Sequence, residues 1–118
     1  MLLADDDERY LESLRALVEE QPELSVVARA RNGLEAIRAA DALEIDAAVI
    51  DLHMPVVDGV TTVAKLRRDH PSLCVIAITG DDEPKLLRAV EEAGADAVLL
   101  KEDLVEALVE RLRAAKLD

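Results

Sequence analysis

The sequence predicts an α/β protein of three layers, in which five βα units form one doubly wound parallel sheet between helices. Two observations carry this prediction. Short apolar runs alternate five times with segments of helical spacing along the 118 residues, as in parallel sheets whose strands are joined by right-handed helical crossovers. The central runs are also apolar at consecutive positions, which is typical of strands that helices cover on both faces.

The expected strands are the five apolar runs. The runs at 45–50 and 73–79 are the most continuous, so they predict the central strands. Ser25 and Arg29 interrupt the run at 24–30, and we therefore expect that strand at an edge of the sheet. The full set of expected strands covers residues 1–4, 24–30, 45–50, 73–79 and 97–100.

The segments between these runs have the spacing of amphipathic helices. In the first, apolar residues at Leu11 and at three, six and seven positions further on fall on one face. Asp7 and Asp58 precede the first and third helices as expected N-caps. Pro84 suits a first helical position, and Gly94 suits a helix end. The expected helices cover residues 8–20, 33–43, 59–69, 84–93 and 103–115.

Polar residues stand where these strands end. We expect the strand order 2-1-3-4-5 of flavodoxin-like sheets, in which ligands bind at the carboxyl ends of the strands, near strands 1 and 3. Polar side chains are placed at four of these ends, so the fold predicts that they converge on one rim. They are Asp5 and Asp6 after strand 1, Asp51 in strand 3, Thr79 in strand 4 and Lys101 in strand 5.

Carboxylates that lie close together at one edge of a sheet repel one another, and this repulsion must be compensated. Two of them about 5 Å apart repel by roughly 3 kcal/mol at an effective dielectric constant of 20, so the cluster needs a cation or raised pKa values. Oxygen ligands of this kind favour Mg2+, which also binds phosphate oxygens. An aspartate beside such a metal can act as a nucleophile toward phosphorus, and alignment and charge neutralisation then supply most of the catalysis.

The composition narrows the classes of function. Twenty-six acidic residues against 14 basic ones give a net charge of -12, which argues against nucleic-acid binding by this domain. No run approaches the ~18 consecutive apolar residues of a membrane helix, and the start of the chain lacks the pattern of a signal peptide. The single cysteine, Cys74, cannot form an intrachain disulfide. We expect a cytoplasmic protein without membrane contacts.

Four blocks of sequence resemble the receiver domains of two-component response regulators. The blocks are Leu-Leu-Ala-Asp-Asp at 2–6, Val-Ile-Asp-Leu-His-Met-Pro-Val-Val-Asp-Gly at 49–59, Ile-Ala-Ile-Thr-Gly at 76–80, and Gly-Ala-Asp-Ala-Val-Leu-Leu-Lys at 94–101. The resemblance covers essentially the whole chain. It therefore implies a single receiver domain at residues 1–118.

The resemblance implies a role for each residue of the rim. Asp51 is similar to the phospho-accepting aspartate, and Lys101 and Thr79 to the residues that contact the phosphoryl group. The Gly80 N–H group is placed to donate to the same group. The implied Mg2+ ligands are Asp5, Asp6, Asp51 and the backbone carbonyl of His53, with Asp5 acting mainly through a bound water.

The resemblance also implies partners and a mode of action. A sensor histidine kinase, or a small phosphodonor, would phosphorylate Asp51. The face formed by the fourth helix, fifth strand and fifth helix would then control an output domain or partner, possible outputs being transcription and a phosphorylation-linked homodimer. The implied protein is a switch that catalyses only its own phosphorylation and dephosphorylation, and it is no conventional enzyme.

The chain departs from the family pattern in three places. Val98 stands where many relatives have an aromatic ring that changes rotamer with the threonine, so an aromatic-coupled switch is not expected. Glu102 follows Lys101 where relatives often have a proline after a cis peptide bond. The first strand begins directly at Met1, whereas relatives carry a few more residues before it.

Three other functions were weighed against this one. A haloacid-dehalogenase-type phosphatase also uses a strand-end aspartate, but it needs a second aspartate where His53 stands. A flavin-binding domain of this strand order needs a loop rich in hydroxyl groups and glycine after strand 1, where this chain has four acidic residues. A receiver fold that serves only to bind proteins stays open, although the complete acidic set argues against it.

Overall fold

One parallel sheet of five strands forms the centre of the molecule. The computed structural model describes residues 1–22, 24–54, 57–80, 83–101 and 110. The strands lie in the order β2-β1-β3-β4-β5, and every neighbouring pair is parallel, which confirms the predicted fold class and strand order. Their bounds are Leu2–Ala4 for β1, Ala28–Ala30 for β2, Ala47–Asp51 for β3, Cys74–Thr79 for β4 and Ala97–Leu100 for β5.

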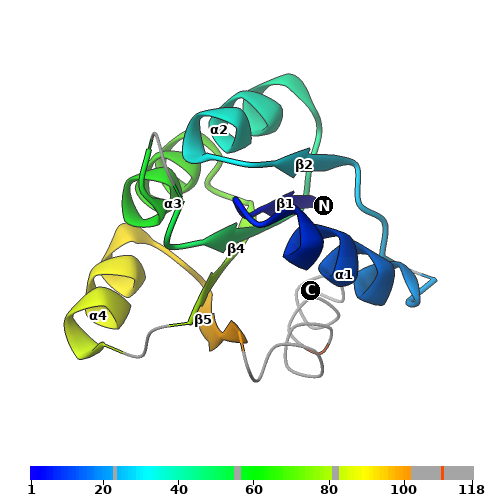
Figure 1. Cartoon of the computed structure of the whole chain (residues 1–118). Helices are drawn as coiled ribbons and strands as arrows, with labels where there is room; N and C mark the ends of the chain where they lie inside the picture. The colour runs from blue at the N-terminus through cyan, green and yellow to red at the C-terminus, as the bar shows by residue number, and fades with distance from the viewer. Residues whose placement is uncertain (23, 55–56, 81–82, 102–109, 111–118) are drawn as a thin grey trace.

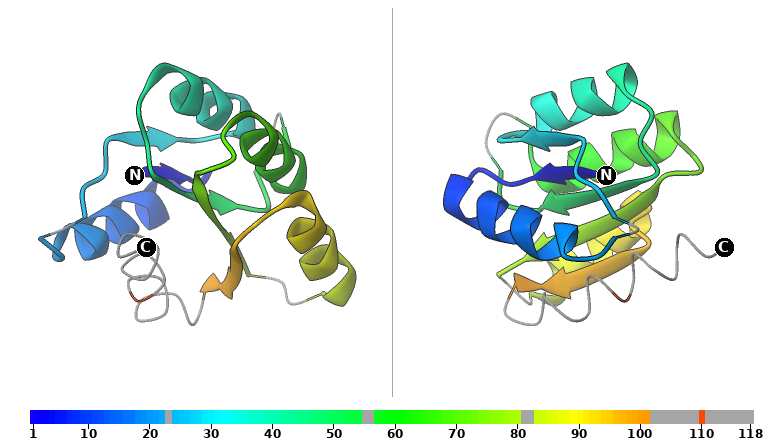
Figure 2. Two further views of the ribbon diagram at one scale, coloured as in Figure 1. Left: turned by 180° about the vertical axis from the view of Figure 1, so that it is seen from behind. Right: turned by 90° about the vertical axis from the view of Figure 1, so that its right-hand side faces the viewer.

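Helices cover both faces of this sheet (Figures 1 and 2). The described helices are α1 at Glu8–Glu19, α2 at Gly33–Ala42, α3 at Gly59–Asp69 and α4 at Pro84–Ala93. α1 packs on one face, and its buried residues share a core with the residues of β1, β3 and β4 that point to that side. α2, α3 and α4 share the second core on the opposite face. Apart from residue 110, the predicted fifth helix, 103–115, lies outside the described residues.

The helix ends follow from local chemistry. Asp7 and Asp58 accept hydrogen bonds from backbone N–H groups at the start of α1 and α3, and Pro84 occupies the first turn of α4. Gly94 ends α4 in the left-handed conformation, with φ 110°, which a residue without a Cβ adopts at little cost. These four predictions are confirmed, and α3 and α4 have the predicted bounds.

The second strand is shorter than predicted, and the reason lies in its partner. β2 pairs only with β1, in a register that places Leu2 opposite Ala28. In that register Val27 lies opposite Met1, and residues 24–26 lie beyond the paired positions of β1. Two further hydrogen bonds extend the contact: the Val27 N–H group donates to the Met1 carbonyl at 2.9 Å, and the Met1 amino group donates to the Ser25 carbonyl at 2.7 Å. The edge position that we predicted for this strand is confirmed.

The contribution of the Asp58 N-cap to the stability of the fold can be measured. The Thr61 N–H group donates to Asp58 Oδ1 at 2.9 Å, and this bond holds the pKa of Asp58 below its ordinary value. A lowered pKa stabilises the folded state above the ordinary pKa, and that contribution disappears as the pH falls through the folded value. We expect Asp58→Ala to lower the free energy of unfolding by about 1 kcal/mol at pH 7.

Urea unfolding at neutral and acidic pH checks this expectation. The penalty of Asp58→Ala should shrink as the pH falls below 3.8, the ordinary pKa of the group. Asp58→Asn is the matched control, because asparagine caps a helix without a titrating charge and should keep most of the stability at neutral pH. A penalty of the same size at both pH values would contradict the electrostatic part of this account.

Candidate functional site

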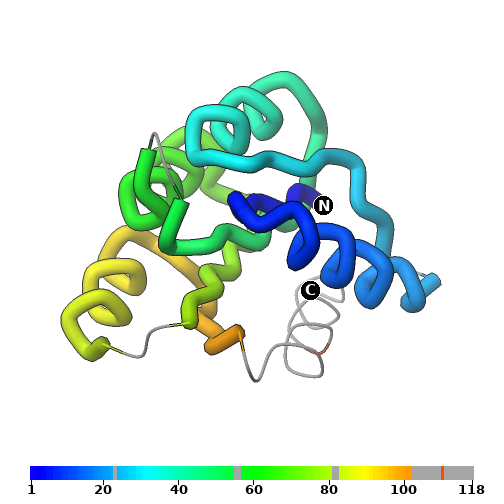
Figure 3. Tube along the Cα trace, viewed as in Figure 1, coloured from blue at the N-terminus to red at the C-terminus, as the bar shows by residue number. Residues whose placement is uncertain are grey.

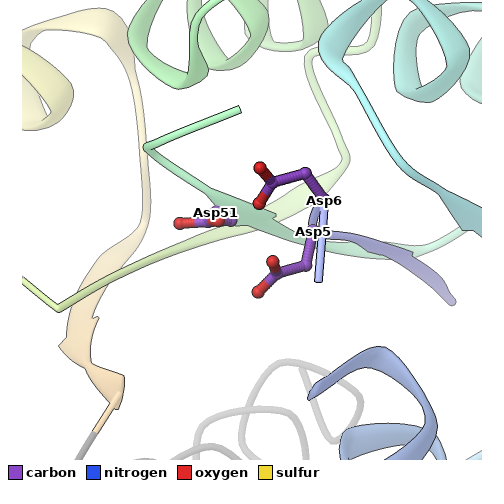
Figure 4. A group of neighbouring side chains, drawn as sticks. All are labelled: Asp5, Asp6 and Asp51. Carbon is purple, nitrogen blue, oxygen red and sulfur yellow. The ribbon is translucent and has the colours of Figure 1, made fainter. Parts of the chain in front are cut away.

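Three carboxylates meet where β1 and β3 end. The strand register pairs Ala4 with Ile50, so the next residues, Asp5 and Asp51, lie side by side at the carboxyl edge of the sheet. Asp6 follows in the short connection from β1 into α1, which the tube trace shows (Figure 3). Each of the three contributes one oxygen to a group in which all the oxygens lie within 4.8 Å of one another. Figure 4 shows their side chains extending to the same side of the strand ends.

Two of these carboxylates are buried. Asp5 is 0% exposed and Asp51 is 2% exposed, whereas Asp6 is open to solvent. Burial is the largest cause that raises the pKa of Asp5, and repulsion from Asp51 adds to it. The Asp7 N–H group and Lys101 oppose the increase without cancelling it. The ionised cluster is therefore under electrostatic stress that a cation would relieve.

Lys101 brings a positive charge to this cluster from the end of β5. Its Nζ atom lies 2.9 Å from Asp5 Oδ2 and 3.5 Å from Asp51 Oδ2. Burial alone would lower the pKa of Lys101, but the hydrogen bond and charge of Asp5 and the charge of Asp51 outweigh it, so the pKa of Lys101 is raised. The ammonium group thus remains charged and links the two buried carboxylates.

Thr79 and His53 occupy the neighbouring part of the rim. Thr79 is the last residue of β4 and is fully buried. The His53 backbone N–H group donates to Asp51 Oδ1 at 3.2 Å, and its ring Nε2 lies 3.2 Å from the Thr79 hydroxyl oxygen. The sequence indicated a role for His53 only through its backbone carbonyl. The residue is exposed, and its ring in addition contacts Thr79; the role of the carbonyl stays a prediction.

Two glycines follow the site strands: Gly80 comes directly after β4, and Gly59 lies against the segment that follows β3. Gly80 is exposed and follows Thr79 directly, and its role as an N–H donor to a phosphoryl group stays a prediction. Gly59 begins α3, where a Cβ atom would come within 2.3 Å of the Leu52 Cα atom and 2.7 Å of the Asp51 carbonyl oxygen. The absence of a side chain therefore lets α3 start directly against the segment that carries Asp51.

Sequence reasoning missed one side chain of this site. Lys101 Nζ lies 4.4 Å from the centre of the Tyr10 ring, which projects from the first turns of α1. Tyr10 is the only aromatic residue of the chain, and that rarity was the available signal. Its place beside Lys101 depends on how α1 packs against the sheet, which spacing alone does not reveal.

The donor set fits Mg2+. Its side-chain ligands are carboxylate oxygens, the type of ligand that Mg2+ prefers. The raised pKa of Asp5 marks a buried negative charge that lacks full compensation, as expected for a site that a divalent cation completes. Asp5, Asp6 and Asp51 would hold the ion, and the His53 carbonyl remains a predicted ligand.

The parallel sheet and the acidic residues at its carboxyl edge define a flavodoxin-like α/β domain with a candidate metal site, and comparison with known proteins identifies the family. Residues 1–113 match the model of the response regulator receiver domain. The chain therefore belongs to the receiver domain family of response regulators.

Individual relatives agree with this assignment. The chain is 37% identical to the nitrate/nitrite response regulator protein NarP of Escherichia coli over 97% of its length and 53% of NarP. It is 30% identical to the transcriptional regulatory protein YdfI of Bacillus subtilis, over 98% of this chain and 54% of YdfI. The receiver domain of the putative response regulator NarL from Mycobacterium tuberculosis superposes with a TM-score of 0.90 at 28% identity, covering 98% and 94% of the two chains.

The matches cover only part of each curated relative. The chain spans about half the length of the curated relatives it matches. Among the helices in the described part of the chain, none has the length and apolar character that crossing a bilayer requires.

Proposed function

We propose that Asp51 accepts a phosphoryl group in a reaction that depends on Mg2+ held by Asp5, Asp6, Asp51 and the His53 carbonyl. One observation carries this proposal: the oxygens of the three aspartates lie within 4.8 Å of one another, at the rim where Lys101 reaches two of them. A structural role for such a cluster would favour fewer charges, because neighbouring carboxylates repel.

The proposed transfer is a displacement at phosphorus. An Asp51 carboxylate oxygen forms the new bond to phosphorus, while the bond from phosphorus to the donor's nitrogen or oxygen breaks and its electron pair leaves with the donor. Bound Mg2+ would supply neutralising charge to the phosphoryl oxygens. Lys101 is already placed beside Asp51 Oδ2, so it can contact a phosphoryl oxygen with little movement of its backbone.

Thr79 is the proposed link from this chemistry to a change of shape. Its hydroxyl lies 3.2 Å from the His53 ring, so a phosphoryl group on Asp51 would add a new acceptor beside a side chain that already contacts a neighbour. Its strand, β4, pairs with β5, and Val98 of β5 packs at the edge of the core under α4. A shift at Thr79 would therefore reach the α4–β5 face and change the population of its conformations. Val98 is small and aliphatic, so this coupling would work without an aromatic rotamer.

The proposed partners follow from the family. A sensor histidine kinase would donate the phosphoryl group, and an output domain or separate protein would read the α4–β5 face together with the helix that the sequence predicts at 103–115. The names of the relatives favour a transcriptional output, while the net charge of -12 argues against direct contact of this domain with nucleic acid. The domain would act in the cytoplasm as a self-modifying switch, and a phosphorylation-linked homodimer is one form that its output could take.

The metal requirement tests the proposal. Incubation with acetyl phosphate and Mg2+ should add one phosphoryl group to the chain, as read by intact-mass spectrometry. The same incubation with excess EDTA should leave the mass unchanged, and added Mg2+ should restore the gain. Equal labelling with and without the chelator would remove the metal from the reaction and contradict the proposal.

A further inference from the structure

Lys101 is enclosed by three groups. Asp5 and Asp51 lie 2.9 Å and 3.5 Å from its Nζ atom, and the Tyr10 ring centre lies 4.4 Å away. An ammonium group over the face of an aromatic ring is attracted by the ring's quadrupole, more strongly where water is excluded. The Lys101 side chain is 28% exposed, so this contact lies partly out of water.

The Tyr10 ring packs against the hydrophobic core beside Lys101. The ring is half-buried and packs against the core cluster that contains Leu11 and Leu14 of α1. Its position is therefore set by the packing of α1 on the sheet. A lysine stem has four rotatable bonds and loses considerable entropy when its end is fixed. A rigid ring beside it reduces the number of positions that the ammonium group can occupy.

The hydroxyl group of Tyr10 makes no hydrogen bond within the described residues that would account for a tyrosine at this position. The phenolic oxygen is buried and has no hydrogen-bond partner within the described residues. Burial raises the pKa of Tyr10 to about 12, so the ring stays neutral at the pH at which the cluster is ionised. The contact with Lys101 therefore comes from the ring face, and phenylalanine could make the same contact.

We propose that Tyr10 is a positioning residue that holds the Lys101 ammonium group against Asp5 and Asp51, ready to meet the incoming phosphoryl group. The inference rests on the proposed function of Asp51. The rate of phosphoryl transfer should depend on an aromatic ring at position 10, and this ring should act by positioning Lys101.

Two substitutions separate the ring from the hydroxyl. Tyr10→Phe keeps the ring, so the rate of labelling by acetyl phosphate with saturating Mg2+ should stay within about twofold of wild type. Tyr10→Leu removes the ring face, and the same rate should fall by about 3- to 10-fold. Leu14→Ala is the matched control, because it weakens the α1 core without touching Lys101, and it should leave the rate of the folded protein unchanged.

A spectroscopic reading checks the geometry independently of the chemistry. In the NMR spectrum of the full chain, the ε-methylene protons of Lys101 should be shifted upfield by the ring. The shift should persist in Tyr10→Phe and in Leu14→Ala, and it should disappear in Tyr10→Leu.

The outcomes of these experiments separate a failure of the positioning role of Tyr10 from a failure of the proposed function of Asp51. A wild-type rate in Tyr10→Leu, an equal loss in Tyr10→Phe and Tyr10→Leu, or an unchanged Lys101 shift in Tyr10→Leu would each overturn the positioning role. A loss in Leu14→Ala as large as that in Tyr10→Leu would assign the effect to α1 stability and would also overturn it. A wild-type chain that takes no phosphoryl group would instead reject the proposed function, and the NMR result would still decide whether the ring holds Lys101.

Discussion

Asp51→Asn should abolish phosphorylation of this chain by acetyl phosphate or by a phosphorylated kinase. The substitution keeps the size of the buried side chain, which is 2% exposed at the end of β3, but it removes the proposed nucleophile and one of the three clustered charges. Intact-mass spectrometry should show no added phosphoryl group, while wild type gains one. The loss should be complete, because the proposal assigns the other two carboxylates of the cluster, Asp5 and Asp6, to Mg2+.

Asp46→Asn is the matched control. Asp46 directly precedes β3 at the opposite edge of the sheet and is exposed, so the same chemical change there should leave labelling at the wild-type level. Hydroxylamine should remove the label from wild type, because an acyl phosphate reacts with this nucleophile whereas a phosphoserine or phosphothreonine does not. Label that survives hydroxylamine, or that persists in Asp51→Asn, would place the acceptor elsewhere.

Asp6→Asn should greatly weaken Mg2+ binding. The side chain is exposed and contributes one of the three clustered oxygens, so its loss should disturb the fold little. Loss of even an outer partner of a metal ligand costs about 10- to 100-fold in metal affinity, and a direct ligand should cost at least as much. Because a ligand that binds only the folded state raises the thermal midpoint, the rise produced by a fixed concentration of Mg2+ should shrink or vanish in Asp6→Asn.

Asp7→Asn provides the comparison. It makes the same change of charge at the next residue, but Asp7 caps α1 through bonds from the Arg9 and Tyr10 N–H groups. Asparagine caps a helix about as well, and Asp7 lies outside the cluster. This variant should retain the Mg2+ response of wild type. Equal losses in the two variants would show that general acidity, and no specific site, attracts the ion.

The sequence predicted best those helices whose ends are set by capping, proline or glycine residues within the same segment. α3 and α4 have their predicted bounds because Asp58, Pro84 and Gly94 act within their own segment. β2 was predicted too long, because its extent depends on where its partner β1 begins. The composition of residues 24–27 contains no information about that register.

The site likewise contains contacts that the sequence could predict and contacts that depend on the packing of separate elements. Asp5, Asp51 and Lys101 could be brought together from sequence, since parallel strands present their carboxyl ends at one edge and the structure places all three within ion-pair distance. The contacts of the His53 ring with Thr79 and of the Tyr10 ring with Lys101 could not. They depend on side-chain conformations across separate elements, which no periodic pattern records.

The central claim is that the rim binds a divalent ion and lets Asp51 form an acyl phosphate. The most direct measurement is a crystal structure of the chain grown with Mg2+ and beryllium trifluoride, a stable mimic of the phosphoryl group. The account predicts density for the fluoride complex joined to an Asp51 carboxylate oxygen, with an ion beside it that Asp5 and Asp6 help to hold. A rim that stays free of both groups at saturating concentrations would contradict it.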